Sequence, residues 1–302
     1  THATMVAGVI GAARNGIGGV GVAYDATLDA KGFIPFSNPT ATVARFREDL
    51  MSMQYYDVVN NSWGQSNPDQ FGWYAGLSAG DPALLMQTQA EFTAQRIAAT
   101  QGRQGLGTVM VYSAGNDRAK GYDAGLSTLT SNEYSITVGG VNLIGNVGGS
   151  TQPSRPFSNR GANILVAAPA SNIMTSGVQV ETADGNKIGS TSAETQGTSF
   201  AAPIVSGIAA LMLQANAKLT YRDVQTILAL TARKDMGTGT VSGTTWSNNQ
   251  DLGWNGVGMH FSDDFGFGMV DAAAAVRMAE TWTPGSSTAE YTNSVAAQAD
   301  AL

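Results

Sequence analysis

Apolar positions follow two spacings that alternate along the chain. Short, nearly continuous apolar runs predict buried strands at residues 19–28, 55–64, 108–117, 134–142 and 162–170. Apolar residues spaced three or four apart predict helices at residues 41–53, 87–105, 198–216 and 219–232. Thr220 and Asp223 have the spacing of a capping box, so the last of these helices should begin beside them. A further helix of small residues is expected to begin at His2.

The alternation of strands and helices indicates the fold class. It predicts βαβ units and an α/β fold built around a mainly parallel sheet. The 302 residues are enough for one large domain with a sizeable core, which we expect to occupy residues 1–282. From residue 283 the sequence becomes polar and small, which predicts a linker or tail over residues 283–302.

Composition excludes several classes of partner. Only 13% of the residues are charged and 37 are glycine, which is typical of a compact domain with tight turns. The net charge of −7 argues against nucleic acid and anionic membranes as partners. Because the chain has no cysteine, it has no disulfide and no thiolate zinc site. No apolar run is expected to reach the roughly 18 residues of a membrane span.

Candidate chemistry lies in three segments: "HATMVAG" with His2, "VMVYSAGND" with Asn116, and "TQGTSFAAP" with Ser199. A serine at a helix N-terminus has its hydroxyl and its N–H where the helix dipole stabilises a developing oxyanion. Asn116 ends a predicted strand, so its amide is held rigidly and can donate to the same oxyanion. Pro203 falls near the start of the helix, where a missing N–H costs little. The plainer alternatives are a helix N-cap for Ser199 and a turn residue for Asn116.

Taken in this order, the three segments resemble the subtilisin-like serine proteases. His2–Gly8 is similar to the family's histidine motif, with Ala3 in place of a glycine, and Gly197–Pro203 is similar to its serine motif. The segments "SWG", "QANAKLTYRDVQ" and "NGVGMHFSDDFGFGMVDAAAAV" are closest to the kexin/furin branch. The resemblance implies a three-layer α/β fold with Ser199 as nucleophile, His2 as general base and Asn116 as oxyanion donor. It also implies two pocket walls that bind substrate backbone, formed by Ser62, Trp63, Gly64, Ser113, Ala114 and Gly115.

The aspartate of the family's triad precedes the histidine along the chain. Only Thr1 precedes His2 here, so we predict an N-terminally truncated catalytic domain that is inactive, or nearly so, as given. Asp57 lies on a predicted strand, but it leads into a substrate-binding segment and does not fit the role. The resemblance further implies a polypeptide substrate, a secreted or extracellular location, and a β-rich domain after this one in the intact chain. The alternative is a pseudo-protease or peptide-binding module without turnover.

The segment "GAARNGIGGVGVAY" resembles the loop by which the family binds calcium. The resemblance implies that Asn15 provides its side-chain oxygen and that Ala13, Ile17 and Gly19 provide carbonyl oxygens. Calcium prefers oxygen ligands of this kind, about six to eight in number. An ordinary glycine-rich turn is the alternative.

Asp69 and Asp123 each follow one of the two predicted pocket walls. The kexin/furin resemblance implies cleavage after arginine or lysine. That preference needs an acid at the bottom of the pocket, because a buried guanidinium without a partner is costly. Arg118 and Lys120 lie nearby and would repel a basic substrate. Broad specificity is therefore the alternative, with the two acids as surface charges.

Overall fold

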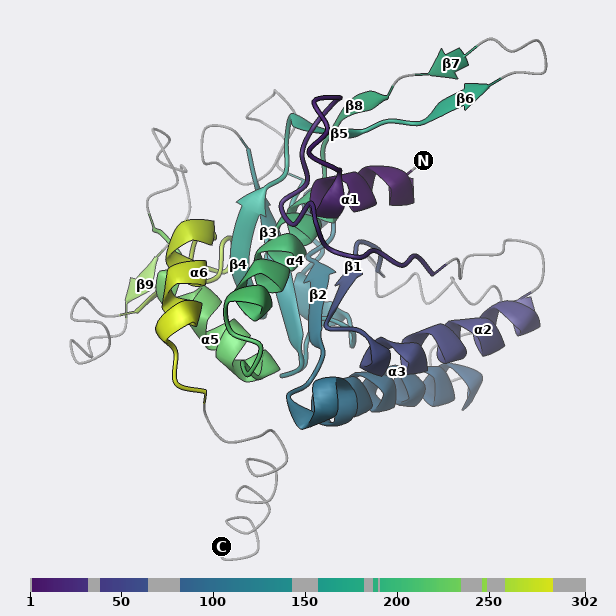
Figure 1. The fold of residues 1–302 in the computed structure, drawn as a ribbon. Coiled ribbons are helices and arrows are strands. Elements are labelled where there is room, and N and C mark those ends of the chain that lie inside the picture. The colour runs from purple at the N-terminus through teal and green to yellow at the C-terminus, as the bar shows by residue number, and fades with distance from the viewer. Residues whose placement is uncertain are drawn as a thin grey trace, which may run out of the picture.

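A four-stranded parallel sheet forms the centre of the molecule (Figure 1). The computed structural model describes residues 2–31, 39–64, 82–142, 157–181, 187–189, 191–234, 246–248 and 259–284. The strands, in their order across the sheet, are β1 (Val58–Asn61), β2 (Val109–Ser113), β3 (Ser135–Val141) and β4 (Ile164–Pro169). The four strands predicted in these regions are therefore confirmed.

All neighbouring strands of this sheet run in the same direction. Val58 pairs with Val109 and Met110 pairs with Ser135, and a bulge after Thr137 shifts the register between β3 and β4. Parallel pairing brings the carboxyl ends of the strands to one edge of the sheet. In open α/β sheets this edge is where ligands bind.

Two helices cover opposite faces of the sheet. Ser206 of α4 (Thr198–Ala215) donates to Asn60 Oδ1 of β1 at 2.9 Å. Gln95 of α3 (Pro82–Gln101) donates to the hydroxyl of Tyr112 at 3.1 Å. Asn60 pairs with Val111, the neighbour of Tyr112, and successive side chains of a strand point to opposite faces. The molecule therefore has the three layers that the family resemblance implies.

The remaining helices pack around these two. α1 (His2–Gly11) packs against α4, and α2 (Pro39–Met51) packs beside α3. α5 (Tyr221–Thr231) begins at the predicted capping box, and α6 (Ala272–Thr281) contacts both α4 and α5. Every helix predicted from the apolar spacing is present.

Short antiparallel pairs lie outside the central sheet. β5 (Ile173–Ser176) pairs with β8 (Ser192–Thr195), and β6 (Gln179–Glu181) pairs with β7 (Lys187–Gly189). The four strands form a ribbon that projects from the body beside α1 (Figure 1). β9 (Ser247–Asn248) pairs with β10 (His260–Phe261).

The predicted strand at residues 19–28 is wrong, because residues 22–25 form turns. The N–H groups of residues 21, 22 and 23 donate to the carbonyls of Ala12, Val9 and Ile10 at 2.8, 3.0 and 2.7 Å. The last carbonyls of a helix have no partner within the helix. Here the chain returns along the end of α1 and satisfies two of them, those of Val9 and Ile10, together with the carbonyl of Ala12 just beyond the helix. Its backbone donors are therefore not used in a sheet.

One expectation about hydropathy is also wrong. α4 is 18 residues long, and by length and composition it is apolar enough to cross a membrane. Within the fold, 67% of this segment is buried, because its apolar side chains cover the sheet and contact α1 and α6. The central helix of a folded core passes the same test of length and composition.

The packed structure continues to the end of α6. Trp282 Nε1, just beyond that helix, donates to Asp223 Oδ1 at 2.9 Å. The predicted tail over residues 283–302 lies outside the described residues from 285 onward.

Candidate active site

A pocket opens where the carboxyl ends of β1 and β2 meet the start of α4. Its lining includes most of the residues predicted to bind substrate or react: Trp63, Gly64, Ser113, Ala114, Gly115, Asn116, Asp123 and Ser199. The parallel sheet explains this convergence, because segments far apart in the sequence leave neighbouring strands at one edge. Asp69 lies outside the described residues.

Ser199 is the second residue of α4, and its carbonyl accepts a hydrogen bond from the segment that follows β1. Pro203 has no N–H, so the carbonyl four residues earlier, that of Ser199, has no partner within the helix. Ser62 Oγ donates to that carbonyl at 2.7 Å. Asn60 Nδ2 donates to Ser62 Oγ at 2.9 Å, and Ser206 Oγ donates to Asn60 Oδ1 at the same distance. This chain of hydrogen bonds fixes the start of α4 against β1.

Asn116 is oriented by its side-chain oxygen. Oδ1 accepts hydrogen bonds from Thr198 N and from Thr198 Oγ1, both at 2.9 Å. Gly115 N donates to Thr198 Oγ1 at 3.1 Å. With Oδ1 engaged by two donors, the Nδ2 group is the end of the amide that can donate to a bound molecule. The orienting role of Thr198 was not predicted, although Thr198 lies within the serine motif.

His2 lies beside the start of α4. Its ring meets Phe200 edge-on, with ring centroids 5.4 Å apart, and Phe200 directly follows Ser199. Partial burial lowers the pKa of His2 below its ordinary value, and the nearby positive amino terminus acts in the same direction. A neutral imidazole can accept a proton. Among the described residues, no hydrogen bond or ion pair joins the ring to a carboxylate.

Asp57 lies at the opposite end of β1 from this site. It precedes the strand, its side chain is 83% exposed, and it pairs with Arg103 Nε at 3.4 Å. The structure therefore agrees with the inference that Asp57 does not orient His2.

Asp123, the predicted pocket acid, is one of the residues that line the pocket. Its Oδ1 accepts from Gly125 N at 2.8 Å, and no ion pair of the described structure includes it. The two nearby cations each face another carboxylate: Lys120 pairs with Asp117 at 2.7 Å, and Arg118 pairs with Asp264. The repulsion that these cations would exert on a basic substrate is reduced by their partners.

The candidate calcium loop follows α1 and is exposed at residues 13–18. Asn15 Oδ1 accepts a hydrogen bond from Ile17 N at 3.0 Å, and Asn15 N donates to the carbonyl of Ala13 at 2.9 Å. An amide oxygen has two lone pairs, so Oδ1 keeps one for a cation. With the carbonyls of Ile17 and Gly19, the loop presents neutral oxygens of the kind that calcium prefers. The described residues include no cluster of three acids or histidines that could hold a metal.

Comparison with known proteins identifies relatives over nearly the whole chain. Residues 1–268 match the model of the subtilase family. Furin-1 of Xenopus laevis is 31% identical over 282 residues, and furin of Homo sapiens is 29% identical over 283. A dibasic-processing endoprotease of Yarrowia lipolytica is 31% identical over 288 residues. Each alignment covers 93% of this chain but 32%, 31% and 26% of the respective relative, so the chain spans about a third of their length.

Solved structures show the same fold. A serine protease of Aeromonas sobria superposes with a TM-score of 0.69 at 22% identity, covering 94% of this chain and 54% of that one. Fervidolysin of Fervidobacterium pennivorans, a keratinolytic enzyme related to subtilisin, gives a TM-score of 0.61 at 24% identity, covering 91% and 36%. At such identities the likeness concerns the fold alone.

Proposed function

The chain belongs to the subtilase family, and on that premise we propose that it carries the reactive groups of a serine endopeptidase. Ser199 attacks the carbonyl carbon of a peptide bond, while His2 accepts its proton and then protonates the leaving amine. Asn116 Nδ2 and the N–H of Ser199 donate to the oxyanion that forms. The two pocket walls bind the substrate as an added strand.

The placement of Asn116 beside the start of α4 carries this proposal. The side chain comes from the end of β2, and Thr198 turns it so that its donor end remains available next to Ser199. A plain turn asparagine would have no need of two hydrogen bonds to the residue before a serine. An oxyanion donor must be preorganised in this way, because reorientation during the reaction would cost free energy.

A fluorophosphonate probe, which labels activated serines, tests the reactive group. We expect labelling of Ser199, mapped by mass spectrometry, and its loss in Ser199→Ala. The control Ser127→Ala changes another serine of the pocket and should be labelled like the unmodified chain. Absence of label from the unmodified chain would favour the peptide-binding alternative.

We extend the proposal to substrates with arginine or lysine before the cut bond. Support comes from Asp123, which is one of the residues lining the pocket and has no ion pair among the described residues, and from the name of the dibasic-processing relative. Binding can be measured by fluorescence anisotropy in the Ser199→Ala background, where peptides stay intact. Peptides with arginine at this position should bind more tightly than those with leucine. The substitution Asp123→Asn should lower the affinity for the arginine peptides at least about tenfold. Tighter binding of leucine peptides would establish the broad-specificity alternative.

Calcium at the Asn15 loop is the remaining part of the proposal, with a secreted or extracellular location where calcium is plentiful. Bound there, the ion would cross-link the loop through Asn15 Oδ1 and the carbonyls of Ala13, Ile17 and Gly19, and it would stabilise the native state. Binding at 100 times Kd stabilises by about 2.7 kcal/mol. A chelator should therefore lower the Tm of the unmodified chain and of the control Arg14→Ala, but not that of Asn15→Ala. If the Tm of the unmodified chain is the same with and without chelator, calcium is removed from the proposal.

A further inference from the structure

The segment that carries Asn116 is held along its length by residues 157–159. Asn159 N donates to the carbonyl of Gly115 at 3.0 Å, and Asp117 N donates to Asn159 Oδ1 at 2.8 Å. Arg118 N donates to the carbonyl of Phe157 at 3.2 Å. Asn159 itself is 2% exposed, and its bond to Asp117 is partly buried. The backbone on either side of Asn116 is therefore fixed by a neighbouring segment.

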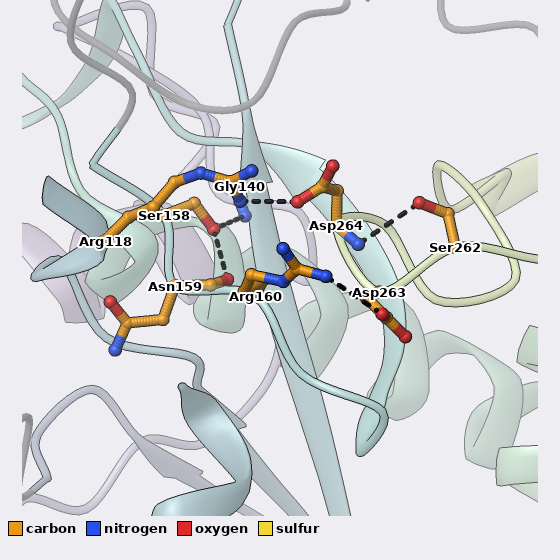
Figure 2. Close-up of polar contacts among 8 residues, drawn as sticks. All are labelled: Arg118, Gly140, Ser158, Asn159, Arg160, Ser262, Asp263 and Asp264. Carbon is orange, nitrogen blue, oxygen red and sulfur yellow. Dashed lines mark hydrogen bonds and ion pairs between the residues drawn. The ribbon is translucent and has the colours of Figure 1, made fainter. Parts of the chain in front are cut away.

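A turn near the C-terminal end of the domain reaches both segments (Figure 2). Asp264 pairs with the guanidinium of Arg118, and the adjacent Asp263 pairs with Arg160 at 3.2 Å. Figure 2 shows the two arginines extending from neighbouring segments toward the two consecutive carboxylates. Gly161 N also donates to the carbonyl of Asp263 at 2.8 Å.

The two ion pairs differ in burial. The side chains of Arg118 and Asp264 are 23% and 10% exposed, whereas those of Arg160 and Asp263 are 55% and 50% exposed. An exposed ion pair contributes little, because water and salt screen it. Removing one partner of a pair that is partly shielded from water costs more, because the other charge stays uncompensated. The Arg118–Asp264 pair is therefore the one that can hold the Asn116 segment.

The turn that carries Asp264 is itself rigidly anchored. Gly266 has a φ of +60°, and a Cβ there would lie 2.3 Å from the carbonyl oxygen of Leu165 in β4. Phe267 N donates to that same oxygen at 2.8 Å, and Ser262 N donates to the carbonyl of Gly266 at 2.9 Å. The backbone of the turn thus lies directly against β4, and the carboxylate of Asp264 is presented from a fixed base.

We infer that Asp264 is a positioning residue for the oxyanion site. Through Arg118 it fixes the segment two residues beyond Asn116, so that Nδ2 of Asn116 stays directed at the oxyanion. Asp264 is not among the described residues that line the pocket, so we place its effect in the contact with Arg118. This inference rests on the proposed function, in which Asn116 donates to the oxyanion.

Two ligands of the same peptide sequence separate oxyanion binding from substrate binding. A peptide boronic acid forms a tetrahedral adduct with a reactive serine and places an oxygen where the oxyanion develops. The matching peptide amide occupies only the ground-state site, and its affinity is measured in the Ser199→Ala background. Loss of one oxyanion donor costs about 10²- to 10³-fold, so partial misplacement in Asp264→Asn should weaken boronate binding about tenfold. The affinity for the peptide amide should stay within about twofold.

Matched variants complete the test. Asp263→Asn removes the exposed pair from the same turn and should leave both affinities unchanged. Asp264→Glu keeps the charge and should restore most of the boronate affinity. Circular dichroism checks the fold of each variant.

Three outcomes would overturn the inference. Equal weakening of both ligands in Asp264→Asn would show a purely structural role, and identical behaviour of Asp263→Asn and Asp264→Asn would show that the less exposed pair has no special role. Ser199-dependent boronate binding that is unchanged in Asp264→Asn would overturn this inference alone. Boronate binding that is unaffected by Ser199→Ala would overturn the proposed function and this inference with it.

Discussion

Pro203 changes the hydrogen bonding of α4 at Ser199, the proposed nucleophile. Because it has no N–H, the carbonyl of Ser199 is available to an outside donor, and Ser62 Oγ supplies one at 2.7 Å. A proline near the beginning of a helix is thus more than a residue that the helix can accommodate. It allows a side chain of the pocket wall to fix the backbone of the proposed nucleophile.

A double-mutant cycle tests this explanation. Ser62→Ala should lower the free energy of unfolding by about 1 kcal/mol, because the partly buried carbonyl of Ser199 loses its donor. In a Pro203→Ala background, residue 203 regains an N–H that can reach that carbonyl, so Ser62→Ala should cost clearly less. Urea denaturation gives all four free energies. An equal cost of Ser62→Ala in both backgrounds would contradict the explanation.

The lowered pKa of His2 predicts a pH dependence. Burial against α4 and the positive amino terminus disfavour the imidazolium in the folded state, so the folded pKa lies below the ordinary value of about 6.5. The resulting stabilisation is fully present above the unfolded pKa and is lost as the pH falls through the folded pKa. An NMR titration should give a midpoint for His2 below that of a peptide spanning residues 1–8.

The chain has a second histidine, His260, whose pKa is also lowered by burial. A His260→Gln variant therefore assigns the signal of His2 unambiguously. A midpoint at or above that of the peptide would show that the ring is solvated in the folded protein.

At the scale of elements, α5 depends on a buried carboxylate that serves three donors. Asp223 Oδ2 accepts from Thr220 N and Thr220 Oγ1, both at 2.8 Å, and Oδ1 accepts from Trp282 Nε1 at 2.9 Å. Asp223 thus joins the cap of α5 to the end of α6. It is 7% exposed, so water cannot replace these bonds.

We expect Asp223→Ala to destabilise the protein by more than the approximately 1 kcal/mol of an ordinary helix cap, because buried donors are left without acceptors. The free energy of unfolding in urea measures the loss. Asp223→Asn keeps the shape and one acceptor and should cost less, and the exposed neighbouring change Lys218→Ala should cost little. A loss no larger for Asp223→Ala than for Lys218→Ala would show that the cap and Trp282 do not depend on this carboxylate.

Local signals in the sequence predicted the elements well. The capping box at Thr220 and Asp223 could be recognised because its two residues are three positions apart and bond mainly to each other. The strand predicted at residues 19–28 failed because alternating apolar residues also suit a segment that lies along the end of a helix. Periodicity indicates which side chains are buried, but it does not indicate which groups the backbone of the segment bonds to.

The candidate site was predictable only in part, for a related reason. Its motifs indicated Ser199, Asn116 and most of the residues that the structure places around the pocket, because short segments carry them. The contacts of Asn159 and Asp264 join residues 42 and 146 positions apart, and no spacing along the chain indicates them.

For the whole molecule, the surroundings of His2 predict how the chain reacts. No carboxylate of the described residues orients the ring, and removing that partner from a Ser-His-Asp triad lowers kcat about 10⁴-fold. The 302-residue chain should therefore cleave a peptide amide very slowly, while it still reacts with an activated ester, which needs less help from the imidazole. Rates with both substrates, each compared with Ser199→Ala, measure this difference. Rapid peptide cleavage that depends on Ser199 would show that a carboxylate from outside the described segments reaches His2.

The hydrogen bonds around Ser199 also bear on how the protein folds. They join residues 82, 137 and 146 positions apart, so the proposed reactive site has a high contact order and forms only after large loops have closed. A chain that has folded in part holds its serine, its amide donor and its imidazole on separate pieces, without the means to cut. A folding molecule cannot digest itself under these conditions. Under the proposed function, cleavage of a partly folded chain requires an encounter with a copy that is already folded, so the rate of that cleavage should rise with the square of the protein concentration.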